Sequence, residues 1–480
     1  MLAASTLLAT VLALGDTILG PEFTQLDLVP GPGKQVPLAM VAAANGEHFV
    51  VYSKPDAQGW PEPWVDHYAH NGARTWSYRH PLTRLPAGQG FDYVRAVATG
   101  ADGALYLAYH STLNGSTSGM FALASDNTLA WDHALVKCSG RAAIFELGAS
   151  HDVLMSFGVG ATRRAAASGA EIWKTTWPQA GLSEDDQHAA IDGAGNVYVV
   201  ARVRSSKSGE QAHGALAIYK VSADGALLWR RSTTYHDHQH PTPKLAFVPA
   251  DDGLVAAFLN TRASADDAIE VHKYDVQGRL LAKHSTDLGL NIGSYQALLA
   301  VRAPDDAVQL AWDDRKLDHS ATKWSTTSVG FARKKGGPAQ ASGNAAIGPT
   351  VVSMSWQGHT LATQELVGAA YDQLVDMTVD DEGRVYMVGV DIDDGDGIRV
   401  AVLPRAAGGT IESRRWQRND RHARPLRIAT TDTRIYVLGA DDTLAGPSAG
   451  GDSDVVHLAF RKRAKARPTK KRTTAIPAMD

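Results

Sequence analysis

One short segment recurs eight times along the 480-residue chain, and this repeat limits the fold more than any other feature. Each copy alternates apolar residues and ends in a polar one. Val, Tyr and Ile at this density, between turn residues, predict β-strands. The copies are HFVVYS (48–53), ALYLAYHS (104–111), DVLMSFGV (152–159), NVYVVARV (196–203), LVAAFLNT (254–261), AVQLAWDD (307–314), RVYMVGVD (384–391) and RIYVLGAD (434–441).

A second apolar stretch and a turn precede most copies, as in HAAIDGAGNVYVV (188–200) and LVDMTVDDEGRVYMV (374–388). The Gly of that turn is free to take a positive φ, so each unit is expected to open with a hairpin. A second hairpin is marked by Gly, three residues, then Trp. Asn127 replaces the Gly in one copy, ahead of Trp131, because Asn tolerates the left-handed conformation. The other copies pair Gly72 with Trp76, Gly169 with Trp173, Gly225 with Trp229, Gly278 with Ala282 and Gly358 with Ala362. Tryptophans at such a regular station predict packing between neighbouring sheets.

Two hairpins per unit give four strands, and the unit lengths fit propeller blades. The sequence therefore predicts an all-β fold, an eight-bladed β-propeller of four-stranded antiparallel blades, with seven blades as the alternative. The last unit, from Pro425 to Arg463, offers only three strands. Residues 23–29 (FTQLDLV) alternate without a unit of their own, and we expect them to supply the outer strand that closes the ring.

The phrases DGAGNVYVVARV (192–203) and DDEGRVYMVGV (380–390) resemble bacterial repeat β-propellers with SBBP-type repeats. VSADGALLWRR (221–231) is similar to the end of the repeats in quinoprotein-like propellers. The resemblance covers nearly the whole chain but concerns the scaffold, and such folds host enzymes and binding proteins alike. Quinoprotein alcohol dehydrogenases usually carry a vicinal cysteine pair, whereas this chain has only Cys138, so no quinone cofactor is expected.

The two ends of the chain differ from the repeats in composition. Residues 1–15 are apolar and uncharged, with small residues at Ala13 and Gly15, which is typical of a signal peptide cleaved before Asp16. The mature domain is then predicted over 16–463, in the periplasm or outside the cell. Residues 461–472 carry eight basic residues, leaving a net charge of −12 on the rest. We interpret 464–480 as a disordered basic tail, the only segment suited to nucleic acid.

No apolar run past the N-terminus is long enough for a transmembrane anchor, and one cysteine excludes an internal disulfide. No feature of the sequence indicates the oligomeric state.

Two clusters are predicted on the face formed by the loops between second and third strands and between units. The first is YHDHQHP (235–241), in which His236, His238 and His240 alternate and so point the same way in an extended segment. Imidazoles placed in this way can bind a transition metal or act as acid and base. The alternative is a solvated loop.

The second cluster is acidic and follows three successive second strands. Carboxylates gathered in one sector of this face suit Ca²⁺ or a cationic ligand, although Asp also simply ends strands. DIDDGDG does not match the twelve-residue Ca²⁺ loop, since Gly stands at its fifth position. The candidate ligand-binding residues are Asp313, Asp314, Asp391, Asp394 and Asp441.

One common enzyme class lacks its motif: the chain has no phosphate-binding Gly-Lys-Ser/Thr loop. Two functions remain open. One is a non-catalytic binding protein that takes a protein or glycan on the loop face. The other is a polysaccharide lyase or hydrolase, in which His240 or His238 acts as base and Asp313 or Asp391 as acid or metal ligand.

Overall fold

The computed structural model describes the chain in a series of segments, and every structural statement below concerns these residues. They are 19–29, 35–43, 45–55, 57, 61–80, 93–111, 117–135, 143–147, 152–157, 160–176, 182–203, 213–236, 245–250, 253–260, 268–287, 298–302, 307–312, 350–355, 360–365, 373–380, 382–391, 397–403, 412–417, 421–443 and 453–462. All their regular elements are β-strands, as the sequence predicts. A search of these segments finds no helix with the length and apolar character needed to cross a membrane.

The described strands form eight sheets, each of four antiparallel strands. Sheets 1 to 4 consist of β2 (Val36–Ala42), β3 (His48–Pro55), β4 (Pro61–Tyr68) and β5 (Arg74–Arg79); β6 (Tyr93–Thr99), β7 (Leu105–Ser111), β8 (Thr117–Leu123) and β9 (Leu129–Leu135); β10 (Ala143–Leu147), β11 (Asp152–Phe157), β12 (Gly160–Arg164) and β13 (Glu171–Thr176); β14 (Leu182–Ile191), β15 (Val197–Val203), β16 (His213–Val221) and β17 (Leu227–His236).

Sheets 5 to 8 repeat the same up-and-down order. They consist of β18 (Leu245–Ala250), β19 (Gly253–Asn260), β20 (Ala268–Asp275) and β21 (Leu280–Asp287); β22 (Leu298–Arg302), β23 (Ala307–Trp312), β24 (Thr350–Ser355) and β25 (Thr360–Glu365); β26 (Gln373–Val379), β27 (Val385–Asp391), β28 (Gly397–Val402) and β29 (Glu412–Trp416); β30 (Arg421–Thr430), β31 (Arg434–Thr443), β32 (Ser453–Lys462) and β1 (Leu19–Val29).

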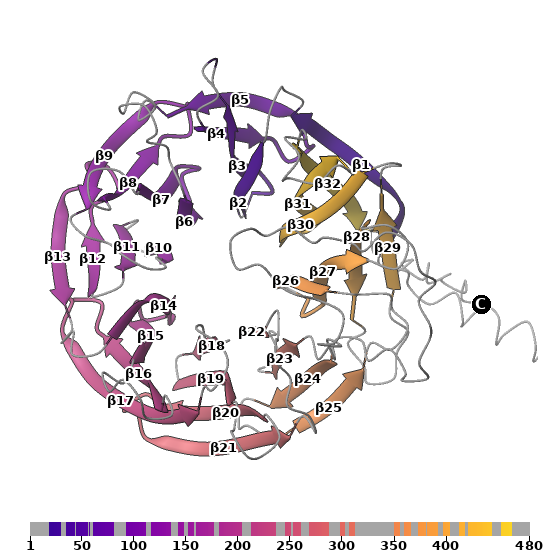
Figure 1. Cartoon of the computed structure of the whole chain (residues 1–480). Coiled ribbons are helices and arrows are strands. Elements are labelled where there is room, and N and C mark those ends of the chain that lie inside the picture. Colours follow the sequence, from indigo (N-terminus) through magenta and orange to yellow (C-terminus); the bar gives the residue numbers. More distant parts are fainter. Residues whose placement is uncertain are drawn as a thin grey trace, which may run out of the picture.

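The sheets lie around a common centre, as in a propeller (Figure 1). The first strand of each sheet is nearest the centre and the fourth strand follows the circumference. Contacts between first strands run from β2 to β6, β10, β14, β18, β22, β26 and β30, and β30 contacts β2 again. Each described sheet therefore packs face to face against two neighbours.

The outer strand of sheet 8 comes from the other end of the chain. β1 pairs with β32 in antiparallel register, with Phe23 opposite Phe460 and Val29 opposite Val455. This is the pairing that the sequence predicts for residues 23–29. Leu19 extends the strand toward the N-terminus, and its backbone N–H donates to Glu412 Oε2 of sheet 7 at 3.0 Å.

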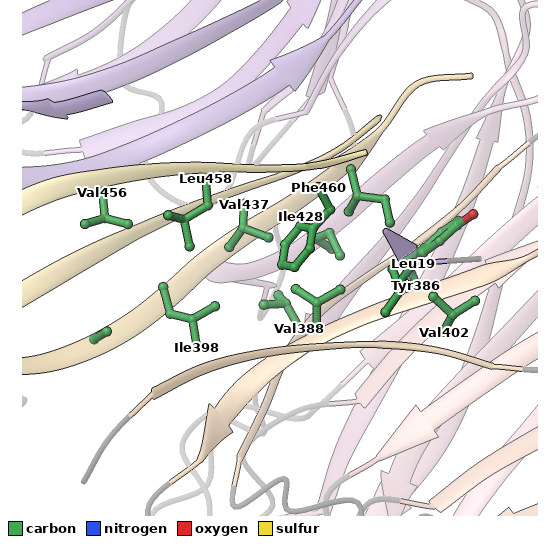
Figure 2. Close-up of a cluster of buried hydrophobic side chains, with 13 residues drawn as sticks. Leu19, Tyr386, Val388, Ile398, Val402, Ile428, Val437, Val456, Leu458 and Phe460 are labelled. Atoms are coloured by element: carbon green, nitrogen blue, oxygen red, sulfur yellow. The ribbon is translucent and has the colours of Figure 1, made fainter. Parts of the chain in front are cut away.

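The hydrophobic core is divided into layers between neighbouring sheets. Between sheets 7 and 8, Tyr386, Val388 and Ile398 pack against Val437 and Leu458 (Figure 2). Second strands such as β27 are buried on both faces, so their apolar residues run almost without interruption. That is why the second strands are the clearest repeats in the sequence.

The outer hairpins interlock each sheet with the next one. Trp173 of sheet 3 donates its indole N–H to the carbonyl oxygen of Ala223, in the β16–β17 turn of sheet 4, at 2.9 Å. Gly225 of that turn has φ +87°, and a Cβ there would lie 2.7 Å from the Trp173 ring. The Gly therefore serves both the turn and the neighbouring tryptophan.

The same contact repeats on either side: Trp131 bonds Ala166 at 2.6 Å, and Trp229 bonds Val276 at 2.8 Å. Asn127 is the only described residue other than Gly with a positive φ (72°), as expected from its place in the repeat.

Candidate functional site

Most of the residues predicted for a site lie outside the described segments: Asp313, Asp314, Asp394, His238 and His240. His236 is the last residue of β17 in sheet 4, and Asp391 is the last residue of β27 in sheet 7. Among the described residues no group of three or more His, Cys, Asp or Glu is placed to hold a metal ion.

Asp441 is the one predicted site residue whose side chain the structure describes, and it is fully buried in β31. It lies directly opposite Asp454 of β32, which is also buried. Two carboxylates that face each other across a strand pair repel. Both side chains are buried where β31 and β32 pair.

The first of four buried polar clusters joins sheet 1 to sheet 8. His48 and His457 share a hydrogen bond between their Nε2 atoms at 3.1 Å, and the His48 ring stacks on Tyr436 with centroids 3.9 Å apart. Burial, and then the neighbouring His457, lowers the pKa of His48 to about 2. Burial lowers the pKa of His457 to about 3. Both imidazoles are therefore neutral at physiological pH, and they fix the contact between the two sheets.

The second cluster joins sheets 1 and 2. His80 Nε2 lies 3.8 Å from Asp132 Oδ2, and the Tyr109 hydroxyl donates to Asp132 Oδ1 at 3.4 Å. Burial lowers the pKa of His80 to about 4 and raises the pKa of Tyr109 and of Asp132. Gly119 leaves the space that the Tyr109 ring occupies, since a Cβ there would overlap the ring.

The third cluster follows one strand, β20, on the face of sheet 5 that packs against sheet 4. His272 lies between Glu270 Oε2, 3.1 Å from its Nε2, and the Tyr274 hydroxyl, 3.2 Å from its Nδ1. Lys283 of β21 lies 2.8 Å from Glu270. Glu270, His272 and Tyr274 are all buried, so this chain of polar groups is closed off by sheet 4.

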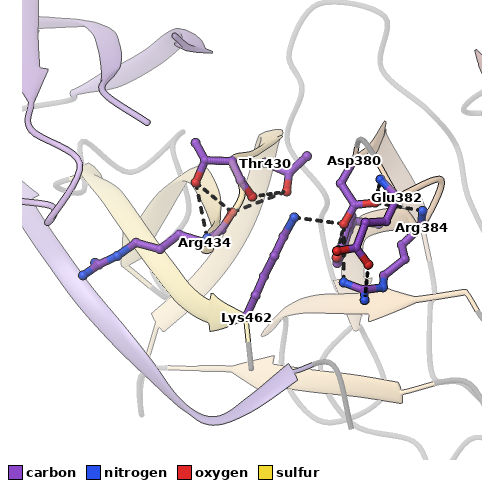
Figure 3. A network of polar contacts seen from close by, with 8 residues as sticks. Asp380, Glu382, Arg384, Thr430, Arg434 and Lys462 are labelled. Atoms are coloured by element: carbon purple, nitrogen blue, oxygen red, sulfur yellow. Dashed lines mark hydrogen bonds and ion pairs between the residues drawn. The ribbon is translucent and has the colours of Figure 1, made fainter. Parts of the chain in front are cut away.

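The fourth cluster joins sheet 7 to sheet 8 (Figure 3). Lys462 Nζ donates to Asp380 Oδ2 at 3.0 Å and lies over the Tyr386 ring at 4.7 Å. Burial raises the pKa of Asp380, but the backbone N–H of Arg384, the Tyr386 hydroxyl and Lys462 outweigh burial, and the net pKa is lowered. The carboxylate is thus ionised and satisfied by its neighbours.

All four clusters have the same chemical limit. Their histidines and their charged groups are packed between two sheets, with Asp132 and Lys283 as the more accessible members. A catalytic base must reach a substrate proton within hydrogen-bond distance. These clusters therefore position sheets, and the described chemistry open to a ligand lies elsewhere.

The outer strands of sheets 2 to 5 carry a row of exposed apolar side chains. All large hydrophobic side chains that are exposed in the described segments belong to it, with exposed fractions from 39% to 57%. Each follows the turn Gly or Asn by two or three residues, so the repeat places them at one station. We call this set the rim row: Leu129, Ile172, Leu227, Leu228, Leu280 and Leu281.

The rim row lies beside the interlocking tryptophans. The Trp of one sheet packs on the Gly turn of the following sheet, and the exposed apolar residues of that sheet come just after this turn. Trp173, for example, contacts Gly225, two residues before Leu227. In sheet 1 the same station carries Arg74 and Thr75. Sequence analysis missed the row. The signal was Leu-Leu beginning two residues after the turn Gly, where an outer strand should meet water.

Basic side chains accompany the rim row in sheets 3 to 5. Lys174, Arg230, Arg231, Arg279 and Lys283 are exposed on or beside the outer strands. Arg279 is paired with Asp275 and Lys283 with Glu270. The row therefore combines apolar contact area with positive charge on a body of net negative charge.

Comparison with known proteins finds no matching family model and no matching curated protein. Solved structures similar to this chain include the WD40 domain of SCAP from fission yeast, with 8% identity and a TM-score of 0.47, covering 92% of this chain and 98% of that one. The polysaccharide lyase Uly1 has 10% identity and a TM-score of 0.44 over 90% of each chain. A protein of unknown function from Dyadobacter fermentans DSM 18053 has 12% identity and a TM-score of 0.39, covering 92% and 100%.

Proposed function

We propose that the chain is a closed eight-bladed propeller that is exported and serves as a non-catalytic scaffold, binding a protein partner through the rim row. The closed ring is supported by contacts between first strands that return from β30 to β2, and by the pairing of β1 with β32. The stability of the ring depends on packing between neighbouring sheets rather than on one central core.

The rim row is the observation that carries the binding function. Apolar side chains that are half exposed recur at one station of four neighbouring sheets. Exposed apolar surface of this kind marks interaction sites in soluble proteins. The described polar clusters are buried between sheets and offer no comparable access. A protein partner is favoured over a glycan, because aliphatic leucines have no flat face on which a sugar ring could stack.

Site-specific photo-crosslinking tests this function. A photoreactive phenylalanine placed at Leu228 or Leu281 should crosslink one protein of the native cell, identified by mass spectrometry. The matched control is Ala73, exposed just after the Gly72 turn of sheet 1, where the rim row is absent. Equal crosslinking at Ala73, or none at the two leucines, would remove the rim row as a binding site.

Export and the loop face are further parts of the proposal. The mature N-terminus should be Asp16, which N-terminal sequencing of the protein from its native compartment can establish. The acidic sector with Asp391 and Asp441, with Ca²⁺ as its candidate ion, stays a second candidate ligand region. The enzyme alternative predicts cleavage of an anionic polysaccharide that His240→Ala abolishes; absence of cleavage across a panel of such substrates would support the scaffold.

A further inference from the structure

Strand β17 (Leu227–His236) carries two residues of the rim row and indicates the chemistry of the partner. Its hydrogen-bonded neighbour is β16 on one side, and the other edge is the outer edge of sheet 4. A free edge presents N–H and C=O groups that can pair with an added strand. We propose that the partner contributes an extended segment of alternating apolar and acidic residues that adds to β17, a proposal that rests on the proposed function.

The apolar part of this match comes from consecutive residues. Leu227 is 43% exposed and Leu228 is 51% exposed. They lie at a bulge, because Leu227 pairs with Val221 and Trp229 with the adjacent Lys220, which leaves Leu228 as the extra residue of the strand. Trp229 follows and is held in place by its bond to Val276 O of sheet 5. An added strand with an apolar residue at every second position can therefore cover one of the leucines along one face.

The charged part comes from the next two residues of the same strand. Arg230 lies over the Tyr219 ring at 5.6 Å, and Arg231 bonds only backbone carbonyls, among them Gly278 O at 2.7 Å. Within the described residues neither guanidinium pairs with a carboxylate, and β17 contains no acidic residue. The two guanidinium groups lie on opposite faces of the sheet, Arg230 over Tyr219 and Arg231 at the Gly278 turn. Acidic side chains at alternate positions of an added strand would lie beside Arg230, where opposite charges stabilise a strand pair.

Two other occupants fit these features less well. A second copy that pairs β17 with β17 would bring its arginines against the same cations, and like charges oppose that contact. A flat anionic bilayer would meet only part of the rim row, because β9, β13, β17 and β21 follow the curved circumference (Figure 1).

The experiment uses the full chain and a labelled ten-residue peptide of alternating Val and Glu, with binding followed by fluorescence anisotropy. Two comparison peptides separate the contributions: Lys in place of Glu tests the charge, and N-methylation of alternate residues removes the backbone donors of one edge. The Val–Glu peptide should bind, and both comparison peptides should bind at least tenfold more weakly.

Variants place the interaction on β17. Leu228→Asp should weaken binding of the Val–Glu peptide about tenfold, since it removes apolar contact and adds a repelling charge. Arg230→Glu should reverse the preference in favour of the Val–Lys peptide. Ala73→Asp on sheet 1 is the control and should bind as the unaltered protein does.

Each contrary result overturns the proposal in a distinct way. Undiminished binding of the N-methylated peptide excludes strand addition, and unaltered preference in Arg230→Glu excludes the charge match. Dimerisation through β17, seen by analytical ultracentrifugation and lost in Leu228→Asp, would make the occupant a second copy. Leu228-dependent sedimentation with phosphatidylserine vesicles would make it a membrane. If the N-methylated peptide binds as well, or if Arg230→Glu keeps its preference, crosslinking at Leu228 would still support the rim row as a binding surface.

Discussion

The buried pair His48 and His457 should make the folded protein sensitive to mild acid. Both pKa values lie far below the ordinary 6.5, at about 2 and about 3, because the folded state buries the neutral rings. In the unfolded chain these two imidazoles each bind a proton as the pH falls through about 6.5. In the folded chain they stay neutral at that pH. The stabilisation is complete above pH 6.5 and is lost progressively as the pH falls toward the folded pKa values.

The size of the effect follows from the distance to 6.5. Between pH 6.5 and pH 5 the contribution of each imidazole to the free energy of unfolding falls by about 2 kcal/mol, since one pH unit corresponds to about 1.4 kcal/mol. The pair together loses about 4 kcal/mol, against a total stability of roughly 5–15 kcal/mol for a folded domain. Urea unfolding at pH 7.5 and pH 5.0, followed by tryptophan fluorescence, measures this difference.

His457→Gln isolates the effect, because Gln can hydrogen-bond to His48 but does not titrate. Its loss of stability between pH 7.5 and pH 5.0 should be smaller than that of the unaltered protein by about 2 kcal/mol. Buried carboxyl groups with raised pKa values, such as Asp66 and Asp376, act in the opposite direction but are present in both proteins and cancel. His70→Gln, at an exposed position, is the control and should retain the full loss. An unchanged loss in His457→Gln would refute the assignment of acid sensitivity to this pair.

Three other changes test the contacts between sheets and the acidic residues. Gly225→Ala should cost about 2 kcal/mol, from the left-handed backbone and from contact with Trp173, and its urea midpoint should fall; no change would mean that the turn adapts freely. Lys462→Met should cost about 1–3 kcal/mol in the same assay, because Asp380 loses one of its two cations while Arg384 Nη1 stays at 3.7 Å; a gain in stability would show that the contact with Lys462 is dispensable. If Ca²⁺ binds the acidic sector, millimolar Ca²⁺ should raise the melting temperature of the unaltered protein but not of Asp391→Asn, and an equal response of both would exclude Asp391 as a ligand.

Much of the fold was predictable from the sequence because each unit encodes its own local structure. The alternation of Val and Tyr in 196–203 and 384–391 specifies strands, and the Gly-containing turns before them specify hairpins. The second strands were clearest because they are buried on both faces. The outer strand at 23–29 was recognisable because the last unit lacked a fourth strand.

The candidate site was far less predictable. The acidic cluster was predicted because its Asp residues end second strands, and the histidine cluster because its His residues alternate between two units. Whether such segments meet in space depends on the arrangement of the sheets, which no local pattern contains. Asp441 illustrates this: the sequence shows only that it ends a second strand, whereas the pairing of β31 with β32 places Asp454 opposite it.

The sequence by itself determined the strands, the turns and the repeating order, because hydrophobic period and backbone preference act over a few residues. Only the tertiary structure decided which residues meet across sheets. Trp173 and Gly225 belong to successive units, and His48 and His457 come from opposite ends of the chain. The tertiary structure also left Leu228 at a free sheet edge, where no neighbouring sheet covers it, and so turned a common apolar residue into a candidate for binding.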